Sequence, residues 1–164
     1  MTAVGHVDVR AVDDDDLDAI FEMMRDPEAV AMAAFTADDP GDRAAFDEWM
    51  SRHRHSPDVE MFTVTEDGGF AGSAALFTIS GDREVTYWIA RHAWGRGVAT
   101  EALRLLVSRE PVRPLFARVA THNVRSAAVL RKAGFTEVSR DRAYAPGVGA
   151  EIEEIVFTLV PAIE

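Results

Sequence analysis

The sequence predicts one α/β domain (α+β mixed), built on a mixed, mostly antiparallel sheet of about seven strands flanked by about four helices. Three observations lead to this class. The 164 residues are 48% hydrophobic and 27% charged, which suits a single globular core. Glycine and proline stand singly between periodic segments, without repeats, so residues 1–164 are interpreted as one domain. Strand and helix patterns follow in the order β, αα, βββ, α, β, α, ββ, and this order favours a mixed sheet.

The N-terminal third predicts one strand and two helices. The strand covers Val7 to Val12. Four apolar residues then recur at the i, i+3, i+4, i+7 spacing of an amphipathic helix: Leu17, Ile20, Phe21 and Met24. The acidic run 13–16 forms its first turn, because the helix dipole favours carboxylates there. A second helix enters through Asp39-Pro40, ends between residues 53 and 57, and carries the apolar residues Phe46, Trp49 and Met50.

The rest of the chain predicts an antiparallel meander followed by alternating helices and strands. Three strands joined by glycine-containing turns are expected at residues 60–65, 70–79 and 84–90. The elements expected after them are a helix with the stripe 99–106, a strand at 115–120, a helix at 126–132, and strands near 136–139 and 152–159. Gly134 ends the last helix, with Phe135 behind it to pack on the final turn.

Composition argues against several classes of function. With 17 Lys and Arg against 28 Asp and Glu, the net charge is -11, which argues against a nucleic-acid partner, because phosphate binding needs clustered Lys and Arg. The same charge attracts a cationic small molecule or peptide. The absence of cysteine excludes a disulfide framework, a thiolate metal site and a cysteine nucleophile, and no spacing of His, Asp and Glu suggests a metal site. The sequence predicts neither a signal peptide nor a membrane span, so we expect a cytoplasmic location.

The stretch from Tyr87 to Ala102 is the most informative about chemistry. It predicts a strand, a loop, a glycine turn and a helix, with Gly95 and Gly97 in the turn. These glycines let the backbone turn without Cβ clashes. The unpaired N–H groups of the first helical turn then face an anion, for which phosphate is the natural ligand. The competing interpretation is a turn whose glycines serve packing alone.

Two common phosphate sites do not fit this turn. A P-loop needs Gly-x-x-x-x-Gly-Lys followed by Ser or Thr, and the chain has no such string. A dinucleotide-binding turn needs a third glycine, but the sequence has Thr100. That site also needs an acidic residue at the end of the next strand, where the sequence reads Thr121-His122-Asn123. NAD is therefore disfavoured.

Two neighbouring segments make the glycine turn specific. Tyr-Trp-Ile-Ala precedes the string Trp94-Gly-Arg-Gly-Val-Ala-Thr-Glu-Ala, and Asn123-Val-Arg-Ser-Ala-Ala-Val-Leu-Arg-Lys-Ala-Gly-Phe135 follows it. Together they resemble the GNAT superfamily of acyl-CoA-dependent N-acyltransferases, and most closely its Rim-type branch, ribosomal-protein-alanine acetyltransferase-like enzymes that acetylate protein N-termini and other amines. The resemblance implies the GNAT fold, with a central splay in the sheet. Trp94 departs from the superfamily's first motif position, as is familiar in the Rim-type branch.

The resemblance implies acetyl-CoA as cosubstrate and assigns residues to it. The pyrophosphate is expected on the backbone N–H groups of Arg96, Gly97, Val98, Ala99 and Thr100. The pantetheine arm is expected beside the backbone of Trp88, Ile89 and Ala90, at the open edge of the splay. The other cofactor residues implied are Asn123 and Ser126 near the pantetheine, and Arg91 and Lys132 near the phosphates. A helix N-cap for Asn123, and surface positions for Arg91 and Lys132, are the alternatives.

The catalytic residues are less clearly marked. Many GNAT enzymes carry a tyrosine four residues before the motif glycine to protonate the departing thiolate, and Leu130 occupies that position. Ser126 matches a Rim-type serine and is the expected acid, with a capping hydroxyl as the alternative. Glu84 is the expected general base, with a solvated strand-end carboxylate as the alternative. His122 and then His92 rank below Glu84.

The predicted function is acetyl transfer from acetyl-CoA to a primary amine, by direct attack in a ternary complex. The acceptor is a small cationic amine or a protein N-terminus, and the second is weakened because Ala143 replaces an acidic residue before Tyr144. Loops 26–41 and 140–150 are expected to line its pocket, with walls from Phe35, Trp49 and Tyr144. A non-catalytic acyl-CoA binding or sensing module is the alternative, because the catalytic tyrosine is missing. The oligomeric state is open, with a homodimer as one option.

Overall fold

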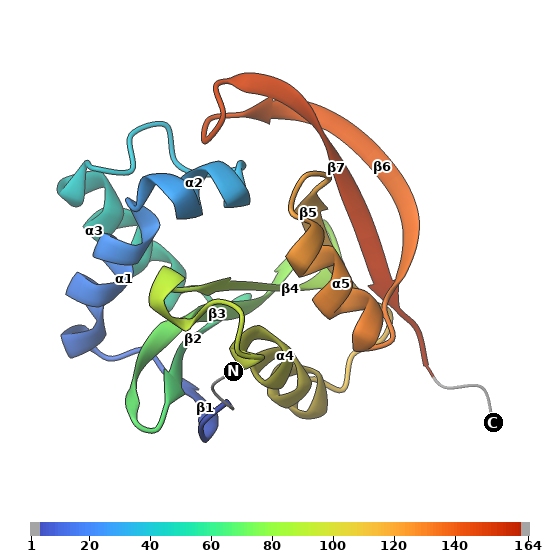
Figure 1. Cartoon of the computed structure of the whole chain (residues 1–164), viewed down its shortest axis with the longest axis horizontal. Helices are drawn as coiled ribbons and strands as arrows, with labels where there is room; N and C mark the ends of the chain where they lie inside the picture. Colours follow the sequence, from blue (N-terminus) through green and yellow to red (C-terminus); the bar gives the residue numbers. More distant parts are fainter. Residues whose placement is uncertain (1–3, 162–164) are drawn as a thin grey trace.

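A seven-stranded sheet runs through the computed structural model, which describes residues 4–161 (Figure 1). The strands, in chain order, are β1 (Val7–Ala11), β2 (Val59–Glu66), β3 (Gly69–Ile79), β4 (Asp82–Ile89), β5 (Leu115–Ala120), β6 (Thr136–Ala145) and β7 (Ala150–Leu159). Their order in space is β1-β2-β3-β4-β5-β7-β6. Neighbours are antiparallel except β4 and β5, so the predicted mixed, mostly antiparallel sheet is confirmed.

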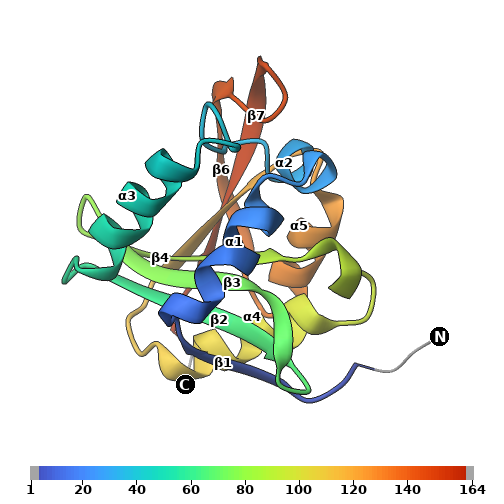
Figure 2. The same ribbon diagram turned by 90° about the vertical axis from the view of Figure 1, so that its left-hand side faces the viewer.

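Helices cover both faces of the sheet. They are α1 (Leu17–Met24), α2 (Pro27–Ala33), α3 (Arg43–Arg54), α4 (Val98–Arg109) and α5 (Val124–Lys132), with short 3-10 turns η1 (Asp14–Asp16) and η2 (Arg91–Ala93). Figure 2 shows α1 crossing in front of β3, with α3 beside it. On that face, Ile20 of α1 and Met50 of α3 are buried in a cluster against which Trp88 of β4 packs.

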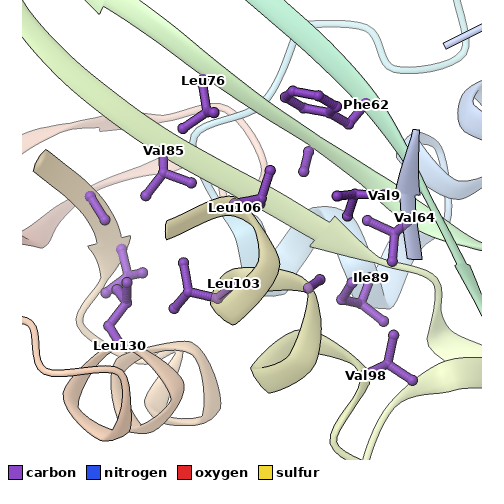
Figure 3. Packing of buried hydrophobic residues seen from close by; sticks show 14 of the residues in the cluster. Val9, Phe62, Val64, Leu76, Val85, Ile89, Val98, Leu103, Leu106 and Leu130 are labelled. Carbon is purple, nitrogen blue, oxygen red and sulfur yellow. The ribbon is translucent and has the colours of Figure 1, made fainter. Parts of the chain in front are cut away.

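The opposite face of the sheet packs on α4 and α5. Figure 3 shows Val85 and Ile89 of β4 in a buried cluster with Leu103 of α4 and Leu130 of α5. Successive side chains of a strand point to opposite faces. The odd-numbered residues of β4 therefore face α4 and α5, and the even-numbered residues, Glu84 among them, face the side of α1 and α3.

The sheet opens at its centre. β4 and β5 pair only at Arg83 with Leu115 and at Glu84 with Phe116. Beyond these residues β4 continues to Ile89 and β5 to Ala120 without pairing to each other. The two strands diverge, as Figure 1 shows. The central splay implied by the family resemblance is therefore present, and it leaves one edge of β4 open.

Helix α2 is a correction to the sequence prediction, which expected about four helices and assigned 26–41 to a loop. Asp26 caps α2 by accepting a hydrogen bond from the Glu28 N–H at 3.3 Å, and Pro27 follows in the first turn. Seven residues give too little periodicity to be recognised as a helix. The expected start of the next helix at Asp39-Pro40 is also wrong, because Asp42 caps α3 through the Ala45 N–H at 3.0 Å.

The last two strands are longer than the sequence indicated. β6 extends to Ala145, and β7 begins at Ala150, so most of the expected loop 140–150 belongs to a hairpin. Residues 136–144 of β6 are all exposed. An exposed strand shows no alternation of apolar and polar residues, which removes the pattern on which a strand prediction depends.

Candidate active site

A cavity of about 630 Å³ occupies the splay between β4 and β5. Its lining comes from β4, β5, the turn 93–97, the start of α4, one face of α5, and the end of α2. The cavity therefore runs from the glycine turn, past the open edge of β4, to the face of the sheet that carries Glu84. Of the predicted cofactor and catalytic residues, it collects Glu84, Trp88, Ile89, Gly97, Ala99, Thr100, Asn123 and Ser126.

The glycine turn presents free amides at one end of this cavity. Gly97 is the N-cap of α4, with a left-handed φ of 88°, and no side chain caps the helix. The N–H groups of the first helical turn have no partner within the helix, so they can bind an anion. A Cβ built on Gly97 would meet no atom closer than Val4 Cβ, at 4.0 Å. The glycine therefore leaves open the space that a ligand phosphate needs.

The open edge of β4 presents Tyr87 and Ile89. The Ala90 N–H donates to the Ala71 carbonyl at 2.8 Å, so the even-numbered residues of β4 direct their backbone groups to β3. The odd-numbered residues direct theirs into the splay. The Ile89 carbonyl accepts a hydrogen bond from Trp94 Nε1 at 2.7 Å. Of the three residues expected beside the pantetheine, Ile89 thus faces the splay, whereas the backbone groups of Trp88 and Ala90 face β3.

The first turn of α5 contains a connected set of polar side chains. Asn123 Oδ1 accepts a hydrogen bond from the Ser126 N–H at 3.2 Å, so Asn123 is the N-cap of α5 and its amide nitrogen is free to donate elsewhere. Ser126 Oγ lies 2.8 Å from the Tyr87 hydroxyl. Burial raises the pKa of Tyr87 to about 12, and the hydrogen bond with Ser126 opposes that rise.

Tyr87 is a site residue that the sequence interpretation missed. Strand alternation predicts that it shares a face with Val85, but nothing in the sequence says that this face meets the first turn of α5. The position at which many GNAT enzymes carry a tyrosine, Leu130, is fully buried in the core. The hydroxyl next to Ser126 therefore comes from β4, on the other side of the cavity, rather than from α5.

A group of charged side chains lines the other end of the cavity. Glu84 is 8% exposed, and its carboxylate lies 3.3 Å from Arg118 Nε. Arg118 Nη1 also contacts Glu154 and Asp141, each at 3.2 Å. Burial raises the pKa of Glu154, and Arg118 opposes that rise. Glu154 and Arg118 were missed because β7 and β5 bring them to Glu84 from distant parts of the sequence.

The cations predicted for the phosphates have other partners or lie elsewhere. Arg91 pairs with Asp26 at 3.1 Å and Glu28 at 3.2 Å. The side chain of Arg96, a residue predicted to bind through its backbone N–H, pairs with Glu66 at 2.6 Å. Lys132 lies exposed in the last turn of α5 and is not part of the cavity lining. A cation that does line the cavity near the turn is Arg125, whose guanidinium lies 5.7 Å from the Trp94 ring centroid.

The two histidines near the splay both contact backbone carbonyls. His92 Nε2 lies 3.1 Å from the Phe70 carbonyl, and His122 Nε2 lies 2.9 Å from the Ala31 carbonyl at the end of α2. Among the expected wall residues, Phe35 lines the cavity. Trp49 of α3 instead packs against the buried cluster that contains Ile20 and Met50, and Tyr144 is 63% exposed.

Within 4–161, no group of three or more His, Cys, Asp and Glu side chains is arranged to hold a metal ion. In the same part of the chain, every helix is too short or too polar to cross a membrane.

The sequence matches a family model described as an acetyltransferase (GNAT) domain over residues 6–136. The chain belongs to this family. It is therefore an acetyltransferase by family, and both the fold and the enzyme class predicted from the sequence are confirmed. A search of curated proteins finds no match.

Solved structures share the fold along most of the chain. Mycobacterium smegmatis RimJ, in complex with CoA-disulfide, is 24% identical with a TM-score of 0.81, over 96% of this chain and 84% of that one. Vibrio cholerae spermidine N-acetyltransferase, in complex with CoA and spermine, is 16% identical with a TM-score of 0.77, over 93% and 95%. Brucella melitensis ribosomal-protein-alanine N-acetyltransferase is 19% identical with a TM-score of 0.76, over 93% and 99%.

Proposed function

We propose that the protein transfers the acetyl group of acetyl-CoA to the primary amine of a cationic acceptor. One observation carries the proposal. A single cavity has the free amides of the glycine turn at one end and two carboxylates, Glu84 and Glu154, at the other, with the open edge of β4 between them. Such a cavity offers a place for the phosphates, the thioester and the amine of one ternary complex.

The cofactor would lie along the first half of this cavity. The α4 amides from 98 to 100 hold the pyrophosphate through the helix dipole and direct hydrogen bonds. The edge of β4 at Tyr87 and Ile89 and the free amide nitrogen of Asn123 face the pantetheine. Arg125 supplies a positive charge beside the turn. Arg91 contributes only if it leaves Asp26 and Glu28. RimJ from Mycobacterium smegmatis and the spermidine enzyme from Vibrio cholerae, both solved with CoA species, support acetyl-CoA as the donor.

The chemistry then follows from the order of groups along the cavity. A neutral amine attacks the thioester carbon, a backbone N–H on the open edge of β4 polarises the carbonyl oxygen, and the C–S bond breaks. The carboxylates of Glu84 and Glu154 first take the proton that turns the bound ammonium into the neutral amine, directly or through water. The second proton, which the nitrogen loses as the amide forms, goes by the same route to water. Ser126 lies on the side of α5, where the departing sulfur would lie.

The acceptor is best described as a cationic amine. Three carboxylates, those of Glu84, Asp141 and Glu154, surround the one guanidinium of Arg118. The cluster therefore keeps an excess of negative charge, which attracts an ammonium group. The structural neighbours include enzymes named for spermidine and for a ribosomal-protein alanine. A small polycationic amine suits the excess of carboxylates better than a peptide N-terminus, which carries a single positive charge, does.

The direct test mixes the protein with acetyl-CoA and a panel of amines and follows the release of free thiol. We expect thiol release with di- and polyamines, and mass spectrometry should find one acetyl group on the amine. The second candidate function is an acyl-CoA binding module without catalysis, which the apolar Leu130 at the usual tyrosine position favours. Tight binding of CoA with no thiol release from any amine would select that candidate.

A further inference from the structure

A tyrosine hydroxyl from β4 reaches the first turn of α5 across the cavity. The Tyr87 hydroxyl oxygen lies 2.8 Å from Ser126 Oγ and 3.3 Å from the Ser126 carbonyl oxygen. Both residues line the cavity, and both are partly exposed. Either hydroxyl can donate across the 2.8 Å contact, and a developing thiolate that takes the Ser126 hydrogen favours the arrangement in which Tyr87 donates to Ser126 Oγ.

This contact determines where the Ser126 hydroxyl can point. A helical serine otherwise turns its hydroxyl back to a carbonyl of the preceding turn. When Tyr87 donates to Ser126 Oγ, it occupies one acceptor position of that oxygen, and the Ser126 hydrogen is left to donate in another direction. The Ser126 N–H is already held by Asn123, so the serine backbone is fixed as well. Ser126 lines the cavity, so its hydroxyl can then donate into the cavity.

We propose that Tyr87 is a positioning residue for acetyl transfer, which directs the Ser126 O–H at the sulfur of coenzyme A. The proposal rests on the proposed function. As the amine nitrogen bonds to the acetyl carbon, the C–S electron pair moves to sulfur, and the Ser126 O–H donates a hydrogen bond to the developing thiolate. The proton lost by the nitrogen goes to the carboxylates of Glu84 and Glu154 and on to water. The thiolate takes its final proton from water.

The two hydroxyls act as hydrogen-bond donors and keep their protons. A cysteine-like thiol titrates near 8.5. Burial raises the pKa of Tyr87 to about 12, far above that of such a thiol, so the phenol stays neutral while the thiolate forms. Donors aimed at a charge that develops in the transition state are among the largest contributions to catalysis. Ser126 then stabilises the leaving group without being a proton donor, which differs from the role predicted from the sequence.

The kinetic test compares Tyr87→Phe, Ser126→Ala and the double variant, with Tyr144→Phe as the control on the exposed tyrosine. We expect kcat to fall ~10-fold in Tyr87→Phe and ~100-fold in Ser126→Ala. The double variant should match Ser126→Ala, because Tyr87 acts only through Ser126. The Kd for CoA and the melting temperature should change little, because phenylalanine keeps the ring. Additive losses in the double variant, or an unchanged kcat in Tyr87→Phe, would overturn the proposal.

A second measurement does not depend on turnover. The thiol of bound CoA is titrated through the ultraviolet absorbance of its thiolate. Hydrogen bonds to the charged form lower a pKa, so the bound thiol should titrate about one pH unit lower in the wild type than in Tyr87→Phe or Ser126→Ala. Equal values in all three proteins would overturn the proposal.

The two measurements separate the proposal from the function on which it rests. If the wild type lowers the thiol pKa but acetylates no amine, the proposed function fails and the positioning by Tyr87 stands. If Tyr87→Phe does not fold, fluorotyrosine in place of both tyrosines keeps the shape and strengthens the donor, and the bound thiol should then titrate still lower. If the bound thiol did not titrate lower in the fluorotyrosine protein, the role of Tyr87 would be contradicted.

Discussion

At the scale of single residues, the position of a side chain in space matters more than its position in a motif. The family motif would have a tyrosine at Leu130, yet Leu130 fills the core and the hydroxyl next to Ser126 comes from Tyr87. The glycine spacing predicted the turn, and the resemblance to the Rim-type branch implied Ser126 and Glu84 as site residues. The sequence did not predict Tyr87 or Glu154, because their roles depend on strand neighbours distant in sequence.

The first residue-scale prediction concerns Gly97. In Gly97→Val a branched side chain would fill the space in front of the α4 amides. We expect calorimetry to show at least tenfold weaker acetyl-CoA binding, about 1.4 kcal/mol. Gly81→Val is a matched control, since Gly81 has a φ of 84° with no atom within 4 Å of a built Cβ, and it lies in the distant β3–β4 turn. Both variants carry similar backbone strain, so a loss of affinity in Gly97→Val alone would come from the blocked space. Unchanged CoA affinity in a folded Gly97→Val protein would contradict the assignment of the phosphate site to the α4 amides.

The second residue-scale prediction concerns the carboxylates. If Glu84 and Glu154 accept the amine's proton, Glu84→Gln and Glu154→Gln should each lower kcat/KM near neutral pH by roughly 10²-fold. The defect should shrink at high pH, where the free amine becomes abundant. Glu153→Gln serves as the control, because Glu153 pairs with the exposed Arg140. Variants with the wild-type pH profile would argue against this assignment.

The raised pKa of Glu154 adds a check on stability. The folded-state pKa of Glu154 lies above its unfolded value, because burial disfavours the ionised carboxylate. The folded protein therefore loses stability as pH rises from the unfolded pKa through the folded pKa, where the native state must hold the ionised group in a poorly solvated place. Glu154→Gln should therefore keep or raise the melting temperature at pH 7. A loss of activity without a loss of stability would mark Glu154 as a functional residue.

At the scale of elements, α2 spans the splay: its start pairs with Arg91 after β4, and the residue after its end packs on Ala120 of β5. Ala34 follows α2 and is fully buried with Ala120 of β5 and Ala145 of β6. Its carbonyl accepts a hydrogen bond from the Gly147 N–H at 2.7 Å, in the β6–β7 turn. A Cβ on Gly147 would lie 2.4 Å from the Val30 carbonyl oxygen, so only glycine fits this contact.

We therefore predict that Gly147→Ala displaces α2 and the cavity wall formed by Met32 and Phe35. Misplaced acceptor contacts should lower kcat/KM for the amine about tenfold or more. The Kd for acetyl-CoA should stay within about twofold, because the amides that hold the pyrophosphate belong to α4, whereas the Gly147 contact joins the β6–β7 turn to the residue after α2. In Gly69→Ala, the control, a Cβ meets the Glu66 carbonyl at an ordinary 3.5 Å. If CoA affinity in Gly147→Ala fell as much as kcat/KM for the amine, the separate roles of α2 and α4 in binding acceptor and cofactor would be contradicted.

The elements also show where prediction from the sequence fails. The strand Leu115–Ala120 was predicted with its observed bounds, and β2 to β4 within one or two residues, because buried strands between turns have a clear pattern. The Gly134 stop was predicted too, and Gly134 has a φ of 98° after α5. Helix α2 and the outer half of β6 were missed, because one is short and the other is exposed, and neither has a periodic apolar face.

At the scale of the whole molecule, the splay between β4 and β5 creates the candidate site within the sheet. Two strands that pair at only two positions leave backbone groups without partners in the middle of the sheet. An unpaired backbone group is costly when it is buried, so such an edge favours a ligand that can pair with it. The composition of the sequence gave no indication of the splay. The resemblance to the GNAT family, with which the order of the elements agrees, implied it.

The net charge of -11 leads to the last prediction. A negatively charged protein attracts a cationic amine over a range that falls from about 30 Å at 0.01 M salt to about 10 Å at 0.1 M. We expect kcat/KM for a triamine to fall roughly three- to tenfold across this range, and less for a monoamine of similar size, because the attraction scales with the charge of the substrate. The KM for acetyl-CoA, an anion, should not rise with salt, so it serves as the internal control. Equal salt dependence for the two amines would show that the field of the protein plays no part in capturing the acceptor, and that recognition rests on contacts inside the cavity.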